Sequence, residues 1–254
     1  MSARNSKKGT RKSRDSAKAT PKREQTRALI YETALQLFQR EGFEATTMRA
    51  IAEAAGLSAG AAYYHFQSKN DLVLEFYVQS EAELRSQMER ICASSPDFFE
   101  RLEALLVFRL EQFETHRKFV GVLFQNAIEP DSPLSPFHPE MLALREEAVA
   151  VFAHLLDSSR LKILPELRPH CPHLLWLYQL GILLFWLHDL SPNRRRTRRL
   201  IQLSMLVLRQ LLRLQRLPFA RQLTRSVIEL LAEFSLRNNA ANAIGSAKAP
   251  VKSR

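Results

Sequence analysis

Apolar residues recur along most of this chain at the spacing of an α-helix. In the first such segment, Ile30, Ala34, Leu37 and Phe38 mark one helical face. No segment alternates strictly enough between apolar and polar residues to predict a strand. The same helical spacing predicts helices from near Arg23 to 42 and over 47–55, 59–66, 72–92, 97–116, 119–127, 140–156, 173–190, 195–214 and 219–234. We therefore expect an all-α protein.

Turn and cap residues separate these segments. Gly42 and Gly56 are placed to end helices in the left-handed conformation that glycine adopts easily. Thr47 and Ser58 are placed to cap the helices that follow, because a hydroxyl oxygen can accept a free backbone N–H at a helix start. The segment Glu129–Pro139 holds four prolines and is expected to be an extended loop.

Composition and charge add a first indication of partners. The chain has 254 residues, of which 46% are hydrophobic, enough for one large domain or two coupled ones. Its formal net charge is +11, and residues 1–23 alone hold nine Lys or Arg against the single Asp15. We expect residues 1–22 to be a disordered basic tail and 237–254 a second disordered tail. The basic excess indicates an anionic polymer or surface as partner.

Several other functions find little support. Cys92 and Cys171 lie far apart, and no apolar signal-peptide core precedes the helices, so we expect a reducing cytoplasm. The most apolar stretch, Leu174–Leu187, is shorter than the roughly 20 residues of a membrane span; a buried helix and no membrane partner are expected. The run His170-Cys171-Pro172-His173 has no fourth ligand at a suitable spacing, so neither a metal nor another cofactor is expected.

Residues 47–55 and 59–66 have the pattern of a helix-turn-helix. Its two short helices are joined by a turn that contains Gly56, and the second helix of such a motif enters the major groove of DNA. Small residues at 59–62 would let that helix approach the groove closely. The donors of Tyr63, Tyr64, His65 and Lys69 follow at positions from which they can reach phosphate oxygens.

Four runs in this region resemble the DNA-binding region of the TetR family over about residues 24–84: Gly42–Ala52, Ala55–Ser58, Tyr63–Phe66 and Lys69–Leu72. The resemblance implies a three-helix DNA-binding head over 23–83, with its helix-turn-helix at about 47–66. It also implies a helical body over 84–236 that dimerises and often holds a small effector. With Arg49 and Ala59 added as base-edge candidates, the expected DNA contacts are Thr46, Thr47, Arg49, Ser58, Ala59, Gly60, Tyr63, Tyr64, His65 and Lys69.

The chain departs from many TetR relatives by carrying alanine at positions 59, 61 and 62. Few side chains then remain for hydrogen bonds to base edges, chiefly Ser58, Tyr63 and Arg49. Because alanine can still contact thymine methyl groups, we expect specificity to depend on those methyls and on DNA shape. The basic tail either adds DNA contacts or only aids solubility.

The late helices predict an interface between subunits. The 173–190 segment is apolar on all sides, which requires burial all round. The 195–214 segment carries a stripe that comprises Leu200, Leu203, Val207, Leu211 and Leu214. One subunit can hardly cover both helices, so we expect a homodimer built on two late helices of each subunit. A purely intramolecular core is the alternative.

An effector pocket is a further expectation for the body. Six aromatic residues are candidates for lining an apolar cavity: Phe108, Phe113, Phe124, Trp176, Tyr178 and Trp186. Aromatic residues at helical spacing also occur in ordinary cores, and that alternative stays open.

Three functions compete at this stage. The first is a cytoplasmic transcriptional repressor that binds a palindromic operator in double-stranded DNA and is released by a small apolar effector. The second is a nucleoid-type protein that binds DNA with little sequence preference. The third is a small lipid-handling enzyme; but since the chain lacks a Gly-rich phosphate loop, a G-x-S-x-G and an HExxH motif, no catalytic residues are expected.

Overall fold

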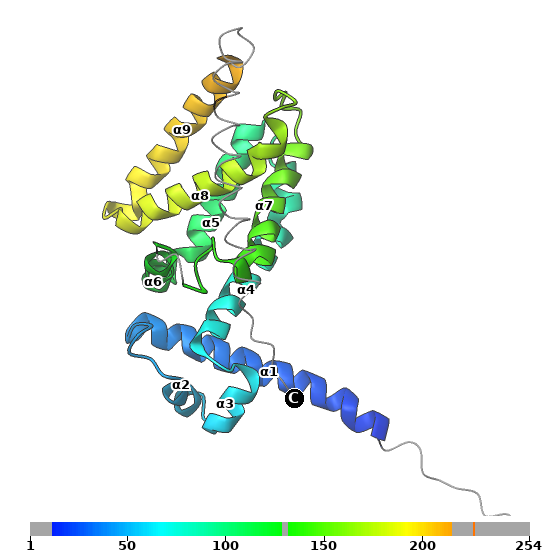
Figure 1. Ribbon diagram of the computed structural model, residues 1–254, viewed down its shortest axis with the longest axis vertical. Helices are drawn as coiled ribbons and strands as arrows, with labels where there is room; N and C mark the ends of the chain where they lie inside the picture. Colours follow the sequence, from blue (N-terminus) through cyan, green and yellow to red (C-terminus); the bar gives the residue numbers. More distant parts are fainter. Residues whose placement is uncertain (1–11, 129–131, 215–225, 227–254) are drawn as a thin grey trace, which may run out of the picture. The chain divides into compact units, whose positions relative to one another are not determined.

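The computed structural model describes residues 12–128, 132–214 and 226, which are mostly helical and contain no strand (Figure 1). The all-α prediction is therefore confirmed. The chain forms two compact units that divide within one long helix, between Glu75 and Phe76. We call them the N-terminal and the C-terminal unit.

The N-terminal unit consists of three helices and the start of a fourth. They are α1 (Lys12–Arg40), α2 (Met48–Ala54), α3 (Ala59–His65) and α4 (Lys69–Ala93). The predicted stripe of α1 is buried, with Ile30 and Ala34 fully inaccessible to solvent. It packs on α2, which in turn packs on α3. The core of this unit is thus made by the residues that the helical spacing identified.

The start of α1 differs from its prediction. We expected the helix to begin near Arg23, whereas it begins at Lys12, so residues 12–22 of the predicted disordered tail are helical. The absence of large apolar residues excludes a buried core there but does not exclude a helix, because Lys, Arg and Ala have high helix propensity. Pro21 lies within α1, where it removes one backbone donor and its ring crowds the carbonyl group four residues earlier. Residues 1–11 lie outside the described part.

The C-terminal unit continues from α4 through five more α-helices and three short 3-10 helices. They are α5 (Phe98–Glu114), α6 (Arg117–Ile128), η1 (Pro139–Met141), α7 (Leu142–Asp157), η2 (Arg168–His170), α8 (Cys171–His188), η3 (Pro192–Arg194) and α9 (Arg195–Leu214). In Figure 1, α7 lies along α8, and α9 contacts both α5 and α8. The predicted range of α9 is matched, and the other helices differ by only a few residues at each end. The predicted helix at 219–234 and the tail at 237–254 lie outside the described residues.

The proline-rich segment before α7 is not extended where it is described, which corrects the prediction. Residues 132–138 form consecutive turns, with backbone hydrogen bonds from Ser135 N to Ser132 O (3.0 Å) and from His138 N to Ser135 O (2.9 Å). Leu134 is buried with 3% of its surface exposed. Proline fixes φ at a value that suits turns as well as extended chain, and the burial of an apolar side chain favours the compact alternative.

Within the described residues, helix α8 is not buried on all sides, as expected if one subunit can hardly cover both late helices. Trp176, Ile182 and Trp186 point into the unit, whereas Leu184 and Phe185 are 46% and 42% exposed. The neighbouring helices cover only one side of α8. In the part of the chain that the structure describes, no helix is long and apolar enough to cross a membrane.

Candidate nucleic-acid interface

Two hydroxyl caps and a glycine turn set the geometry of α2 and α3. Thr47 Oγ1 accepts a hydrogen bond from Ala50 N (3.1 Å), and Ser58 Oγ accepts one from Ala61 N (3.2 Å). Both cap predictions are confirmed. Gly56 has φ +68°, a conformation that other residues rarely adopt, and so permits the tight turn between the helices. The two elements therefore form a helix-turn-helix.

The exposed face of α3 is small and then aromatic. Gly60 is exposed, and Tyr63 and Tyr64 are 49% and 67% exposed, so both phenol groups are available for contact with a partner. Ala62 lies on the opposite face and is fully buried. Of the four small residues at 59–62, one thus serves packing inside the unit rather than approach to a partner.

Two arginines of α1 hold the C-terminal end of α3, and sequence reasoning missed both. The guanidinium of Arg27 donates to His65 O (2.9 Å), forms an ion pair with Glu75 (2.6 Å) and lies 4.1 Å from the centre of the Phe66 ring. Arg23 lies over the ring of Tyr64 at 5.3 Å. Their spacing of four residues on one helix face is the only sequence signal for this role.

Burial and nearby positive charge both disfavour protonation of His65. Its partial burial lowers the pKa of the imidazole, and the positive charges of Arg23 and Arg27 lower it further. The ring lies against Tyr64, with centroids 5.2 Å apart in an edge-to-face arrangement. The end of α3 therefore presents two phenols beside an imidazole whose pKa is lowered in the free protein.

Two of the predicted contact residues have other partners in the structure. Thr46 is fully buried, and its hydroxyl donates to Gly42 O at 2.7 Å, so this prediction does not fit the free protein. Lys69 Nζ donates to Phe43 O (2.6 Å) and Glu44 O (3.4 Å) and lies 4.4 Å from the centre of the Phe43 ring. An ammonium has three N–H groups, so Lys69 fixes the loop before α2 and keeps at most one donor for a phosphate.

The remaining predicted contacts are accessible to different degrees. Thr47, Arg49 and Ser58 are exposed, and Ala59 is half-buried beside them. Since Thr47 and Ser58 accept backbone hydrogen bonds with their oxygens, their hydroxyl hydrogens stay free to donate. These residues and the exposed face of α3 form the candidate interface.

The six aromatic residues predicted to line an effector pocket lie in different surroundings. Phe113 packs against Phe76, with ring centroids 5.6 Å apart, in the core between α4 and α5. Trp176 contacts Phe137, Tyr178 forms a hydrogen bond with Ser204, and Trp186 donates to Glu114 (2.9 Å). Phe108 and Phe124 are half-buried. The pocket stays a prediction.

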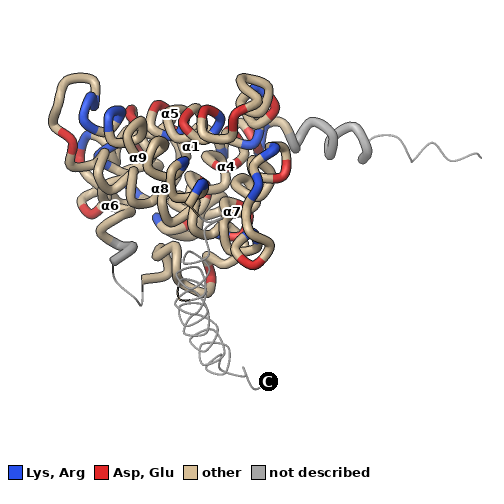
Figure 2. Tube along the Cα trace, turned by 90° about the horizontal axis from the view of Figure 1, so that it is seen from above, with Lys and Arg blue, Asp and Glu red and all other residues tan. Residues whose placement is uncertain are grey.

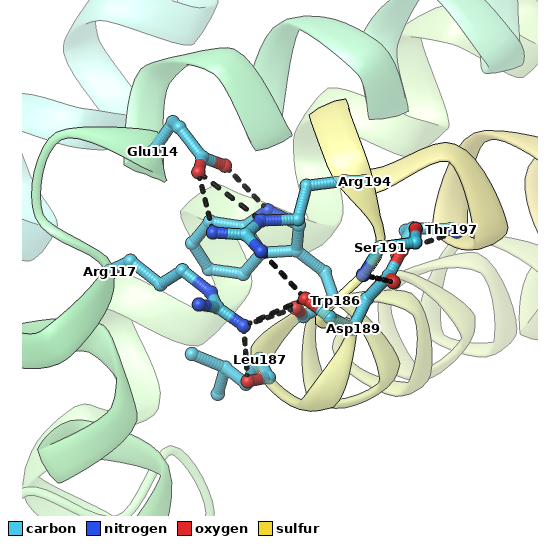
Figure 3. A network of polar contacts seen from close by, with 8 residues as sticks. All are labelled: Glu114, Arg117, Trp186, Leu187, Asp189, Ser191, Arg194 and Thr197. Atoms are coloured by element: carbon cyan, nitrogen blue, oxygen red, sulfur yellow. Dashed lines mark hydrogen bonds and ion pairs between the residues drawn. The ribbon is translucent and has the colours of Figure 1, made fainter.

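A polar network fixes the corner between α8 and α9 (Figure 3). Arg117 Nη2 donates to the backbone oxygens of Leu187 (2.6 Å) and Asp189 (3.1 Å). The Asp189 carboxylate accepts from Ser191 N (2.8 Å) and from Thr197 N and Oγ1 (2.9 and 2.8 Å). Burial opposes ionisation of Asp189, but these hydrogen bonds outweigh it and lower its pKa. The corner is held rigidly, which fixes the direction of α9.

Helix α9 has a long apolar face that the described residues leave exposed. Its Thr197, Ile201 and Met205 are buried in the unit. On the other side, Leu203, Leu206, Val207, Leu211 and Leu214 are between 43% and 60% exposed. Together with Leu184 and Phe185 of α8 they form what we call the α8–α9 face. A contiguous set of large exposed apolar residues is typical of a protein interface.

The fold and the candidate interface on α2 and α3 define a helix-turn-helix protein with an all-helical C-terminal unit. Comparison with known families agrees. The family model described as "Tetracyclin repressor-like, C-terminal domain" matches residues 101–231, and the model "Bacterial regulatory proteins, tetR family" matches residues 30–76. The chain belongs to the TetR family.

Individual relatives with similar sequences align with this chain over only part of its length. The HTH-type transcriptional regulator YerO of Bacillus subtilis is 34% identical over 106 residues, 41% of this chain and 36% of that protein. The HTH-type transcriptional repressor KstR2 of Rhodococcus jostii is 34% identical over 96 residues, 38% of this chain and 47% of that protein. The match thus spans less than half the length of these relatives.

Solved structures share the fold over a larger part. FadR of Thermus thermophilus, a TetR-family repressor in complex with lauroyl-CoA, has a TM-score of 0.55 at 24% identity over 75% of this chain and 95% of that one. FadR of Bacillus halodurans, a fatty acid degradation regulator, has a TM-score of 0.58 at 16% identity over 71% and 94%. At these identities the likeness concerns the fold alone.

Proposed function

We propose that this protein is a dimeric transcriptional repressor that binds a palindromic operator through α2 and α3 and leaves it when a small molecule binds. The observation that carries the proposal is the capped helix-turn-helix of a TetR-family chain whose second helix exposes Gly60, Tyr63 and Tyr64. DNA binding of this kind takes place in the cytoplasm, and we assign the protein no catalytic role.

The proposed DNA contacts follow from exposure. They are Thr47, Arg49, Ser58, Ala59, Gly60, Tyr63, Tyr64 and His65, with Lys69 mainly supporting the loop before α2. Thr46 is left out because it is buried. The hydroxyls and the imidazole suit phosphate oxygens, and Arg49 and Ser58 suit base edges.

The DNA contacts are tested by selecting duplexes from a random pool and measuring affinity by fluorescence anisotropy at one salt concentration. The double variant Tyr63→Phe/Tyr64→Phe keeps both rings and removes both hydroxyls. The dimer loses four hydroxyls per operator complex, and if each donates one hydrogen bond of about 1 kcal/mol net, affinity for the full operator should fall by about a thousandfold. Gln36→Ala, an exposed change on α1, is the control and should bind like the parent. Equal affinity of the double variant and the control would contradict the assignment.

Dimerisation is proposed to use the α8–α9 face. Its apolar side chains gain most from burial against a second copy, since about 25 cal/mol is recovered for each Å² removed from water. Sedimentation equilibrium should give a dimer for the parent and a monomer for Val207→Glu/Leu211→Glu. Val78→Glu places a charge on another exposed apolar residue, on α4 (43%), and should remain dimeric. A dimeric double variant would refute this interface.

Control by a small apolar effector is proposed because a neighbour in fold, the Thermus thermophilus repressor, was solved with lauroyl-CoA. A titration of the DNA complex with lauroyl-CoA, with free coenzyme A as the matched control, is the first test. Release of DNA by lauroyl-CoA alone would support an acyl-type effector. No release by any of a panel of acyl chains would support a constitutive DNA-binding protein instead.

A second candidate is a nucleoid-type protein of low specificity. Its supporting observations are the net charge of +11 and the small exposed face of α3, which offers few groups for base recognition. The ratio of affinities for selected and random duplexes separates the two. A repressor should prefer the selected site by about 10³ or more, whereas a nucleoid-type protein should bind both nearly equally.

A further inference from the structure

The start of α9 carries a concentration of positive charge that the proposed function does not use. Five arginines occur within residues 194–199. From Cys171 to Leu214 the chain has seven arginines, no lysine and a single acidic residue, Asp189. The basic positions can be followed as blue segments of the tube (Figure 2).

Only some of these arginines have an acidic partner. The ion pairs join Arg194 to Glu114 (3.0 Å), Arg198 to Glu111 (3.3 Å) and Arg209 to Asp97 (2.8 Å). Arg195, Arg196 and Arg199 are exposed and form no ion pair with any residue that the structure describes. We call these three the arginine cluster.

The position of the cluster is electrostatically unfavourable for the free protein. It occupies the first turns of α9, where the helix dipole is positive and disfavours cations. Arg195 and Arg199 are separated by four residues, and Arg196 and Arg199 by three, so their charges lie on neighbouring surface positions and repel one another. A bound anion would relieve both effects.

The cluster also lies at the end of the proposed dimer interface. Arg196 precedes Leu200, Leu203 and Val207 at the spacing of one helical stripe, so it continues the apolar face toward the start of α9. The two-fold symmetry of a homodimer would place the α8–α9 face of a second subunit against the first, with an arginine cluster at the end of each face. Helices α8 and α9 and the turn between them hold a single acid, Asp189, which is buried and whose carboxylate already accepts hydrogen bonds from Ser191 and Thr197.

We propose that the arginine cluster is a binding site for a phosphate-bearing anion, and that this anion strengthens the dimer. The proposal rests on the dimer of the proposed function. Guanidinium groups bind phosphate through paired, charge-assisted hydrogen bonds, and three of them side by side suit an anion with two phosphate groups. The anion replaces the acidic residues that the interface lacks.

The experiment uses the full chain and inorganic pyrophosphate as the probe. Sedimentation equilibrium gives the dimer dissociation constant in sodium chloride and in millimolar pyrophosphate at equal ionic strength. We expect pyrophosphate to lower this constant about tenfold, which corresponds to a 1.4 kcal/mol gain. The variant Arg196→Gln/Arg199→Gln should dimerise more tightly than the parent in sodium chloride and should not respond to pyrophosphate.

A matched control removes the same charge elsewhere. Arg90→Gln/Arg160→Gln changes two exposed arginines of the C-terminal unit outside α9 and should respond to pyrophosphate like the parent. If the control loses the response as the cluster variant does, or if the parent dimer responds equally to both salts, the anion site is refuted. A parent and a cluster variant that are both monomeric in every buffer would instead refute the dimer of the proposed function.

Discussion

A buried ion pair between α4 and α5 provides the sharpest test of how the C-terminal unit is stabilised. Arg109 is 1% exposed, and its Nη2 donates to both carboxylate oxygens of Glu81, at 2.8 and 2.9 Å. Its Nη1 donates to Gln112 Oε1 (3.0 Å) and Ser80 O (3.3 Å). Arg109 thus makes four hydrogen bonds from a site that water scarcely reaches.

The variant Arg109→Met keeps much of the side-chain volume and removes the charge. It leaves the Glu81 carboxylate, only 12% exposed, without its cation. Breaking a buried pair in this way costs about 3–5 kcal/mol of unfolding free energy. In Arg109→Met/Glu81→Leu both charges are gone, so the desolvation penalty disappears with them. That double variant should return to within about 2 kcal/mol of the parent.

Urea unfolding followed by circular dichroism measures these differences, at one fixed protomer concentration because dimerisation would shift the midpoint. Arg85→Met is the control: it breaks the exposed pair with Glu147, whose side chains are 50% and 45% accessible, and should cost less than about 1 kcal/mol. An Arg109→Met loss no larger than that of Arg85→Met would refute the reasoning. So would a loss for Arg109→Met/Glu81→Leu that equals the sum of the losses measured for Arg109→Met and for Glu81→Leu alone.

Three further predictions concern single groups. Ser58→Ala removes the cap of α3 and should lower the unfolding free energy by about 1 kcal/mol in thermal unfolding, with Ser58→Gly less affected. Burial and the charges of two α1 arginines lower the pKa of His65, so DNA binding should take up a proton and tighten from pH 8 to 6; anisotropy with His65→Gln should show a flat profile. Burial of Asp189 opposes its ionisation, but hydrogen bonds from Ser191 and Thr197 lower its pKa; the resulting stability is present above about pH 4 and lost as pH falls through the lowered pKa. Asp189→Asn should therefore have a lower unfolding free energy than the parent at pH 7. The two unfolding free energies should converge as the pH falls in acid unfolding experiments.

Local interactions explain why much of the N-terminal unit is predictable. A cap such as Thr47 or Ser58 depends on a hydroxyl and on an N–H three residues later, both of which are visible in the sequence. The buried stripe of α1 depends on helical spacing alone, and Gly56 on a backbone conformation that other residues avoid. Features of this kind need no knowledge of distant segments.

The residues that were misjudged depend on partners far along the chain. Lys69 has its ammonium bound by carbonyl groups at 43 and 44, a contact that only the folded unit brings together. Arg27 was overlooked because its partners, His65 and Glu75, are 38 and 48 residues away. The turns at 132–138 bring Leu134 into the core, where it is buried. The number of prolines in the segment does not reveal this burial.

The structure also narrows what α3 can read on DNA. Of the alanines expected to contact thymine methyl groups, Ala62 is fully buried and packs within the unit, so only Ala59 and Ala61 remain for that role. Gly60 is exposed between them and lets the backbone approach a groove wall without contributing a side chain. The phenols that follow suit phosphates better than bases, because a single hydroxyl cannot form the paired contacts that distinguish bases. Affinity should therefore depend mainly on Tyr63 and Tyr64, and specificity on two methyl groups, Arg49 and the shape of the operator.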